Sequence, residues 1–221
     1  MSKVFALIVA AGEGRRFGEP KQFAVVAGRP LIEWSLEAFE GHPDVDAVIL
    51  VLPRREDAGG LREKFPKIAS VVEGGPRRQD SVRNGFLEVR GGLGDIVLVH
   101  DGARPLPGTG LITRVIEETS RTGAAVPVLA LEDTVKEICD GAVARTLDRD
   151  RLFRVQTPQG FFHEVLREAL ESAQGAGFLG TDEATLVERT GKRVTAVQGD
   201  RRNIKVTVPD DLKIVEALLE I

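Results

Sequence analysis

The sequence lacks the features that define several classes of protein. It has one cysteine, Cys139, among 221 residues, which excludes an intrachain disulfide and a thiolate metal cage. It has no basic excess either: 34 acidic residues outnumber 30 lysines and arginines, and the formal net charge is -4. A dedicated nucleic-acid-binding domain is usually basic, so this class is not expected. The 3 histidines are scattered and indicate no catalytic triad.

Long apolar runs are also missing. No window approaches the roughly 18 consecutive apolar residues that a membrane-spanning helix requires. The apolar part of the first stretch, MSKVFALIVAAG, is too short for a secretory signal sequence, and acidic residues follow it directly. We therefore expect a cytoplasmic protein that binds neither a membrane nor nucleic acid.

What the sequence has is an alternation of strand-like and helix-like segments. The run VFALIVA (4–10) is apolar and β-branched, as is typical of a strand buried on both faces of a parallel sheet. Strand-like runs recur at 45–53, 68–75 and 95–105, and helix-like segments separate them at 30–39, 54–64 and 79–89. This order predicts one α/β domain over residues 1–221, built on a Rossmann-like, doubly wound, mostly parallel sheet.

The alternation changes after residue 124. Several strand-like runs follow one another there with no room for a helix between them. DTVKEI and VARTLD flank Asp140 and Gly141, a strong turn signal, and predict a β-hairpin arm at about 130–152. Such an arm needs a surface to pack on, and a lid or a partner subunit usually provides one. Near the C-terminus, NIKVTV (203–208) predicts another strand before a closing helix at 209–219.

The segment AAGEGRRFGEPKQF follows the first strand and combines glycines with cations. A dinucleotide-binding turn requires G-x-G-x-x-G opening into a helix, but Gly12, Gly14 and Gly18 are spaced one residue too far, and Pro20 follows. A Walker A loop is excluded because no Lys-Ser or Lys-Thr follows a glycine at its spacing.

The remaining interpretation is an extended loop that surrounds a nucleoside triphosphate. The glycines let the backbone approach phosphate oxygens, and Arg15, Arg16 and Lys21 supply three nearby positive charges that a polyanion would neutralise. A solvated surface loop is the alternative. The position at the end of the first strand favours the ligand site, since ligands of such sheets bind at the carboxyl ends of the strands.

This loop is also the first of seven motifs that together resemble one enzyme family. It is similar to the signature of nucleotidyltransferases that join a sugar or polyol phosphate to a nucleotide. It is followed in order by GGPRRQDSVRNG, VHDGARP, DTVKE, LDRDRLFRVQTPQGF, TDEATLVE and NIKVTVPDDL. The series resembles the 2-C-methyl-D-erythritol 4-phosphate cytidylyltransferases over nearly the whole chain.

The resemblance implies transfer of CMP from CTP to 2-C-methyl-D-erythritol 4-phosphate, with release of pyrophosphate and with Mg²⁺ bound. Such a transfer needs cations and one or two carboxylates more than an acid–base pair, because the attacking phosphate oxygen is already ionised. Three alternatives remain open: a ribitol 5-phosphate cytidylyltransferase, a sugar-1-phosphate transferase that uses UTP or GTP, and a non-catalytic nucleotide sensor.

The resemblance also implies roles for individual residues. The catalytic cations would be Arg16, Lys21 and Lys205, with Arg15 left out, and Asp101 would hold Mg²⁺. The substrate-binding residues would be Ala10, Ala11, Gly12, Gly14, Gly74, Gly75, Ser81, Arg104, Thr134, Arg149, Thr157 and Thr181. Of these, Thr134 and Arg149 lie on the hairpin arm, which in this family crosses into the other subunit of a homodimer.

One position departs from the family pattern. Arg202 stands before Asn203-Ile204-Lys205, where the family has aspartate. If the side chain of Arg202 faces the phosphate site, its charge alters the fit of the substrate; if it faces solvent, it has no such effect. The sequence does not distinguish these two orientations.

Overall fold

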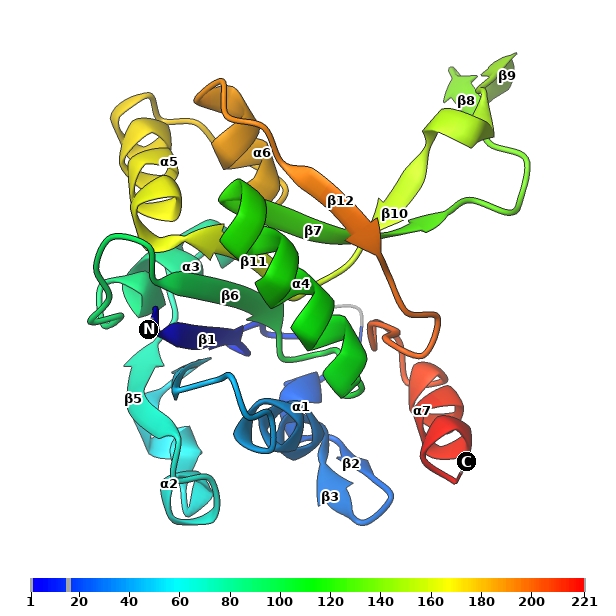
Figure 1. Ribbon diagram of the computed structural model, residues 1–221. Coiled ribbons are helices and arrows are strands. Elements are labelled where there is room, and N and C mark those ends of the chain that lie inside the picture. Colours follow the sequence, from blue (N-terminus) through cyan, green and yellow to red (C-terminus); the bar gives the residue numbers. More distant parts are fainter. Residues whose placement is uncertain (1, 15–16, 221) are drawn as a thin grey trace.

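The computed structural model describes residues 2–14 and 17–220, and its described part contains an eight-stranded sheet flanked by helices (Figure 1). The strands of this sheet are β1 (Val4–Val9), β4 (Ala47–Leu52), β5 (Ile68–Glu73), β6 (Ile96–Asp101), β7 (Ala124–Ala130), β10 (Phe153–Val155), β11 (Gln159–Phe162) and β12 (Thr195–Gln198). The helices are α1 (Leu31–Glu40), α2 (Leu61–Lys64), α3 (Arg78–Phe86), α4 (Thr109–Thr122), α5 (His163–Gly175), α6 (Glu183–Arg189) and α7 (Asp211–Leu219).

The order of the strands creates the ligand site of a doubly wound sheet. Strands β6, β1, β4 and β5 lie side by side and are all parallel. From β1 the chain builds outward through β4 to β5 and then returns to place β6 on the other side of β1. This reversal opens a crevice at the carboxyl ends of β1 and β6, where doubly wound proteins bind their ligands.

The second half of the sheet is mixed. Strand β11 lies antiparallel between β6 and β7, and β10 is also antiparallel to β7. Val128 of β7 pairs with Val155 on β10 and with Gln198 on β12, so β12 lies along the opposite edge of β7. The predicted α/β class with a mostly parallel sheet is confirmed, and the antiparallel strands are an addition that the sequence did not predict.

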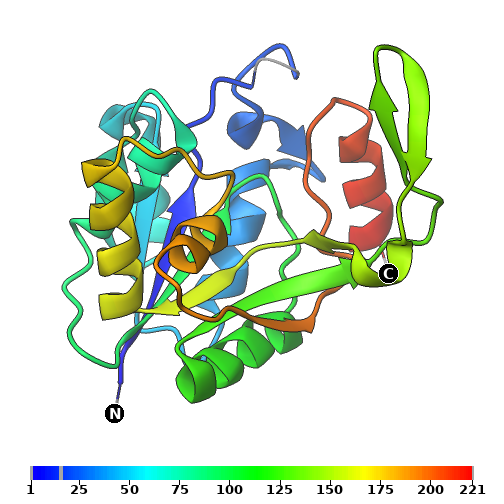
Figure 2. The same cartoon turned by 90° about the horizontal axis from the view of Figure 1, so that it is seen from above.

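Both faces of the sheet are buried, as the uninterrupted apolar strands require. Phe5 and Leu7 of β1 point to the face covered by α3, α5 and α6. Ala6 and Ile8 point to the other face, which α1 and α4 cover. A separate small cluster joins α7 to Val26 and Leu31, and Figure 2 shows α7 set apart from the layers that flank the sheet.

The predicted arm is present. Strands β8 (Lys136–Cys139) and β9 (Ala142–Thr146) form a two-stranded hairpin that projects from the body of the molecule (Figures 1 and 2). The turn takes Asp140 and Gly141 to positive φ angles of 50° and 79°, as a tight hairpin with this pair requires. A second short ribbon, β2 (Val25–Val26) with β3 (Arg29–Pro30), precedes α1.

Two predicted elements differ. The helix predicted at 54–64 is a 3₁₀ turn (Arg55–Ala58) followed by the short α2, because Gly59, at φ 45°, and Gly60 interrupt it. The strand predicted at 203–208 is wrong: this segment joins none of the sheets that the described residues form. Asn203 and Val206 are both fully buried, but they lie three positions apart, so their burial does not follow the period of two that a strand requires. Val206 donates a single backbone hydrogen bond to Ala103 instead of entering a ladder.

Within residues 2–14 and 17–220, none of the helices has the length and apolar character needed to cross a membrane.

Candidate active site

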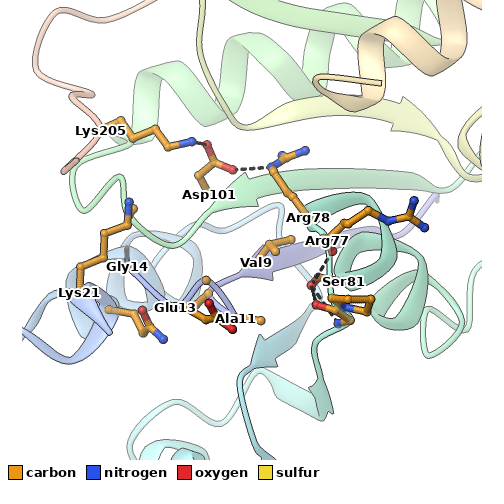
Figure 3. Close-up of a pocket in the computed structure, with 16 residues that line it drawn as sticks. Val9, Ala11, Glu13, Gly14, Lys21, Arg77, Arg78, Ser81, Asp101 and Lys205 are labelled. Atoms are coloured by element: carbon orange, nitrogen blue, oxygen red, sulfur yellow. Dashed lines mark hydrogen bonds and ion pairs between the residues drawn. The ribbon is translucent and has the colours of Figure 1, made fainter. Parts of the chain in front are cut away.

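A cavity of about 420 Å³ lies at the crevice between β1 and β6 (Figure 3). Four segments of the chain form it: the loop after β1, the turn after β5 with the start of α3, the end of β6, and the stretch around Lys205. Its lining residues are Val9, Ala10, Ala11, Gly12, Glu13, Gly14, Lys21, Gln22, Gly75, Pro76, Arg77, Arg78, Ser81, Asp101, Ala103 and Lys205.

The cavity brings together nine of the residues that the sequence singles out: Ala10, Ala11, Gly12, Gly14, Lys21, Gly75, Ser81, Asp101 and Lys205. Gly74 lies directly behind this lining, since a Cβ on it would be 2.2 Å from Cβ of Ala11. Arg16, predicted to be catalytic, and Arg15 lie outside the described residues.

The glycine loop needs glycine at one position in particular. Gly14 has a φ of 67°, and a Cβ on it would lie 1.8 Å from the carbonyl oxygen of Glu19. No other residue fits there without moving the backbone. At the far end of the loop, the ammonium of Lys21 donates to the carbonyl oxygen of Val206 at 2.8 Å. The loop is thereby joined to the segment that carries Lys205.

The turn after β5 forms the opposite end of the cavity. Ser81 is buried, and its Oγ accepts a hydrogen bond from the backbone N–H of Gly75 at 3.1 Å and donates to the carbonyl oxygen of Arg77 at 3.2 Å. The turn is therefore closed by the helix that follows it. A side chain at Gly74 or Gly75 would collide with Ala11 or Asp80, which leaves backbone exposed to the cavity. The predicted role of Gly74, Gly75 and Ser81 in substrate binding stays a prediction.

Asp101 is the electrostatic centre of the site. Its Oδ2 lies 2.6 Å from Nζ of Lys205, and its Oδ1 accepts a hydrogen bond from Nε of Arg78 at 3.0 Å. Figure 3 shows these two cations converging on the carboxylate from opposite sides. Burial acts to raise the pKa of Asp101, but the charges of Arg78 and Lys205 outweigh it and hold this pKa well below its usual range. Asp101 is therefore ionised at neutral pH.

A buried hydrogen-bond chain holds Asp101 from behind. The backbone N–H of Asp101 donates to Oγ1 of Thr157 at 3.0 Å, and that hydroxyl donates to Nδ1 of His100 at 3.1 Å. Nε2 of His100 donates to the carbonyl oxygen of Arg104 at 3.0 Å. A carbonyl only accepts, so the proton of the neutral imidazole is on Nε2. The side chain of His100 is fully buried and packs in the interior.

The burial of His100 makes folding stability depend on pH. Burial lowers the pKa of His100 from 6.5 to about 4, so between these values the unfolded chain binds the proton and the folded chain does not. We expect the free energy of unfolding of the protein without metal or nucleotide to fall by roughly 3 kcal/mol from this residue as the pH drops from 7 to 4.

Urea unfolding of the wild type and of His100→Gln at several pH values isolates this effect, because other groups titrate in both proteins. The difference between the two unfolding free energies should shrink steadily below pH 6.5. A difference independent of pH would show that His100 is not kept neutral by the fold.

Arg104 and Thr157, both predicted to bind substrate, lie beside the cavity and not in its lining. Nε of Arg104 is 4.0 Å from Oδ2 of Asp101, and Nη1 donates to the carbonyl oxygen of Asn203 at 2.8 Å. The amide of Asn203 in turn donates to the carbonyl oxygen of Thr157 at 2.7 Å. Burial lowers the pKa of Arg104, although the guanidinium remains charged. These residues connect the end of β6 to the segment that carries Lys205.

Three predicted substrate residues lie away from the cavity. Thr134 and Arg149 are exposed on the arm, where Arg149 donates to the carbonyl oxygen of Glu132. Thr181 is exposed before α6, and its hydroxyl is 3.2 Å from that of Thr185. Their predicted roles stay predictions.

Two charged residues of the site were missed. Arg78 lines the cavity, and its Nη1 donates to Oε1 of Glu183 at 2.8 Å. Burial raises the pKa of Glu183, and Arg78 opposes this effect. Both residues lie inside quoted motifs, GGPRRQDS and TDEA, but Arg77 and Asp182 stand beside them. Nothing in the sequence distinguishes Arg78, which pairs with Asp101 and Glu183, from Arg77, which also lines the cavity but pairs with Asp80.

The departure at Arg202 is explained by the fold. Arg202 is exposed, and its Nη2 donates to the carbonyl oxygen of Leu218 at 2.6 Å, at the end of α7. A cation is favourable there, because the last carbonyl groups of a helix carry partial negative charge. The arginine is absent from the cavity lining and stabilises α7 instead.

The donor set fits one magnesium ion held together with a substrate. Among the described residues, no three histidine, cysteine, aspartate or glutamate side chains gather as a metal cage. Mg²⁺, however, is commonly held by one or two carboxylates plus substrate phosphates, and Asp101 supplies an ionised carboxylate at the cavity wall. Lys205 and Arg78 each contact one of its two oxygens, so a metal ion bound there would compete with these two cations for the carboxylate.

A cavity at the switch point of a doubly wound sheet, with a glycine loop, several cations and one carboxylate, defines a nucleotide-binding α/β enzyme of the nucleotidyltransferase type. Comparison with known proteins agrees. The model of the 2-C-methyl-D-erythritol 4-phosphate cytidylyltransferase family (IspD) matches residues 4–221. The chain belongs to this family and is a cytidylyltransferase.

The similarity extends over the full length of the relatives. The 2-C-methyl-D-erythritol 4-phosphate cytidylyltransferase of Syntrophotalea carbinolica is 40% identical over 224 residues, which cover 98% of this chain and 96% of the relative. That of Geobacillus thermodenitrificans is 41% identical over 221 residues, 97% and 96% of the two chains. The crystal structure of the Thermus thermophilus enzyme has a TM-score of 0.82 at 38% identity and covers 97% of this chain and 98% of its own.

Proposed function

We propose that this chain transfers CMP from CTP to 2-C-methyl-D-erythritol 4-phosphate, in the non-mevalonate route to isoprenoid precursors. The observation that supports this most directly is the group formed by Asp101, Lys205 and Arg78, which faces the glycine loop and Lys21 across one cavity. An oxygen of the acceptor phosphate attacks the α-phosphorus of CTP. The new O–P bond forms as the bond to the β-phosphate oxygen breaks, and pyrophosphate leaves.

The chain's own residues act on charge and position in this reaction. The acceptor oxygen is already ionised at neutral pH, so no general base is needed, and the buried neutral His100 is not available as one. Lys21 and Lys205 neutralise negative charge on the transferring phosphoryl group. Gly12 and Gly14 let the loop backbone approach the triphosphate, and the turn at Gly74 and Gly75 places backbone groups against the cytosine. Arg16 is proposed as a further cation of the loop.

Asp101 is the residue proposed to hold Mg²⁺, together with phosphate oxygens of the substrate. When bound, the ion neutralises charge on the phosphates and orients them for in-line attack. When Lys205 gives up its ion pair with Asp101, its ammonium group becomes available to contact the α-phosphate. Lys205 is about one third exposed in the structure, which leaves it room to move.

Pyrophosphate release tests the proposed acceptor. The protein with CTP and Mg²⁺ should release pyrophosphate when 2-C-methyl-D-erythritol 4-phosphate is added, and much less with equal amounts of ribitol 5-phosphate. The reverse preference would identify the alternative acceptor. Replacement of CTP by UTP or GTP should suppress the reaction, and CTP binding without turnover would indicate a sensor.

Lys21→Ala is expected to lower kcat by roughly 10²-fold, because a cation beside the transferring phosphoryl group is lost. The fold should persist, since Lys21 is partly exposed and its hydrogen bond to the carbonyl oxygen of Val206 lies outside the strands of the sheet. Steady-state kinetics measure the effect, and circular dichroism checks the fold. Lys213→Ala on the exposed face of α7 is the matched control and should keep wild-type kinetics. A kcat within threefold of the wild type would remove Lys21 from the mechanism.

The arm is proposed to complete the site of a second subunit in a homodimer. Arg149 and Thr134 do not line the cavity of their own chain. The arm exposes Ile138 and Val143, and the adjoining strand β10 exposes Phe153 and Val155, apolar side chains that a partner would cover.

Mixing two inactive variants tests this arrangement. Arg149→Ala and Lys205→Met are each expected to reduce turnover strongly. After joint refolding, half of the molecules should be mixed dimers, in which one of the two sites has both wild-type residues. We therefore expect recovery of about a quarter of the wild-type activity by this statistical count. No recovery in a mixture shown to be dimeric would mean that Arg149 acts within its own subunit.

A further inference from the structure

Arg78 lies in the wall of the cavity between two carboxylates, and the mechanism above gives it no task. It is the first residue of α3, and Figure 3 shows its side chain extending from that helix toward Asp101. Nε donates to Asp101 at 3.0 Å and Nη1 donates to Glu183 at 2.8 Å. A guanidinium carries five N–H groups. Two are used, and the other three have no hydrogen-bond partner among residues 2–14 and 17–220.

Glu183 holds this arginine from outside the cavity. It is the first residue of α6 and is 1% exposed, and it does not belong to the cavity lining. Within the described residues, Arg78 is its one side-chain partner, and its Oε2 has none. A buried carboxylate is costly unless it is paired, so the position of Glu183 depends on the guanidinium.

The pair gives Arg78 an attachment that does not depend on Asp101. If Asp101 binds a metal ion, an arginine that paired with Asp101 alone would lose its only negatively charged partner in the cavity wall. With Glu183 behind it, the guanidinium retains one ion pair and stays in place. The N–H groups released by Asp101 then join those already unpaired, and a planar guanidinium binds two phosphate oxygens at once.

We propose that Arg78 contacts phosphate oxygens of the bound nucleotide, and that Glu183 is the positioning residue that keeps Arg78 in the cavity wall when Asp101 is engaged elsewhere. The inference rests on the proposed CTP-dependent function. Its location favours the nucleotide over the acceptor phosphate, because Arg78 shares the cavity wall with Ser81 and Gly75, on the side where the cytosine and ribose are proposed to bind.

Calorimetric titration with CTP and Mg²⁺, in the absence of acceptor, tests this assignment. Arg78→Met should raise the Kd for CTP by about 10- to 100-fold, as expected for loss of hydrogen bonds to a charged group. Arg78→Lys should recover part of the affinity, since lysine keeps the positive charge but cannot bind two phosphate oxygens at once as a planar guanidinium does. Arg83→Met, on the same helix but outside the cavity lining, is the matched control and should bind CTP as the wild type does.

The double variant Arg78→Met/Glu183→Leu separates binding from a purely structural ion pair. Apolar replacement of a buried ion pair is often neutral for stability, so this protein should fold with a near-normal Tm. If the pair only joins α3 to α6, the double variant regains wild-type CTP affinity, and the proposal is overturned. If Arg78 contacts phosphate, the double variant stays as weak as Arg78→Met.

Glu183→Gln tests the positioning role. It keeps an oxygen for Arg78 but removes the charge, and we expect a several-fold higher KM for CTP with an unchanged KM for the acceptor. An effect confined to the acceptor KM, in this variant or in Arg78→Met, would assign the guanidinium to the acceptor phosphate and overturn the proposal. A wild-type chain that binds no CTP would instead contradict the proposed function itself, which keeps the two failures distinct.

Discussion

Lys205→Met is expected to lower kcat by roughly 10²- to 10³-fold and to leave the protein folded. The ammonium lies 2.6 Å from Asp101 at the cavity wall, where negative charge builds up on the transferring phosphoryl group. Methionine retains most of the length and apolar surface of the lysine stem, so packing around Val206 and Ile204 should change little. Steady-state kinetics with saturating CTP and acceptor measure the loss.

Two comparisons make this result specific. Lys192→Met removes a surface lysine that pairs with Glu168 and should leave kcat unchanged, because exposed ion pairs contribute little. Lys205→Arg retains the positive charge but not the compact shape, and should recover only part of the rate. A Lys205→Met protein with near-normal kcat would remove this lysine from the chemistry and leave Lys21 and the loop as the source of positive charge.

Asp101→Asn should combine a large loss of turnover with a loss of stability. The carboxylate faces Arg78, Lys205 and Arg104, and an amide leaves these cations to repel one another. Both Arg78 and Lys205 are about one third exposed and Arg78 keeps Glu183, so we expect a stability loss of roughly 2 kcal/mol, below the range for a fully buried pair. Turnover should fall by roughly 10³-fold, since the proposed metal site loses its charge.

The stability effect has a defined dependence on pH. The pKa of Asp101 is lowered by folding, so its contribution is complete above its ordinary value of 3.8 and is lost as the pH falls toward the folded-state pKa. The difference in unfolding free energy between the wild type and Asp101→Asn should therefore be constant from pH 7 to about pH 5 and shrink below it. Denaturant unfolding without metal or nucleotide measures this, and an Asn variant as stable as the wild type would show that the cations do not need the carboxylate.

A substantial part of the fold and of the candidate site can be predicted from local features of the sequence. Gly12 and Gly14 directly after a buried strand, with Lys21 close behind, predict a phosphate-binding loop because backbone freedom and charge are properties of residue type. Asp101 at the end of another buried strand belongs to the same edge of the sheet, because parallel strands end together. The hairpin also follows from local sequence, since Asp140-Gly141 takes up the backbone angles of a tight turn.

Other parts of the site depend on contacts between distant segments. The partner of Arg78 on α6 lies 105 positions away in the sequence, and neither motif alone indicates which arginine or which carboxylate turns inward. The segment 203–208 shows the same limit. Its alternation of apolar and polar residues is typical of a strand, but whether a strand forms depends on a neighbouring strand edge, and none of the described strands offers one to it.

The class of fold, the glycine loop and the carboxylate at the end of β6 can be predicted from the residues alone, because propensity, spacing and charge act over a few residues. The contacts of Lys205 and Arg78 with Asp101, the support of its backbone by Thr157 and His100, and the hydrogen bond of Arg202 to the end of α7 follow only from the folded chain. A side chain's charge and hydrogen bonds are completed by whichever groups the packing of the sheet and helices brings beside it. That pairing is a property of the whole fold.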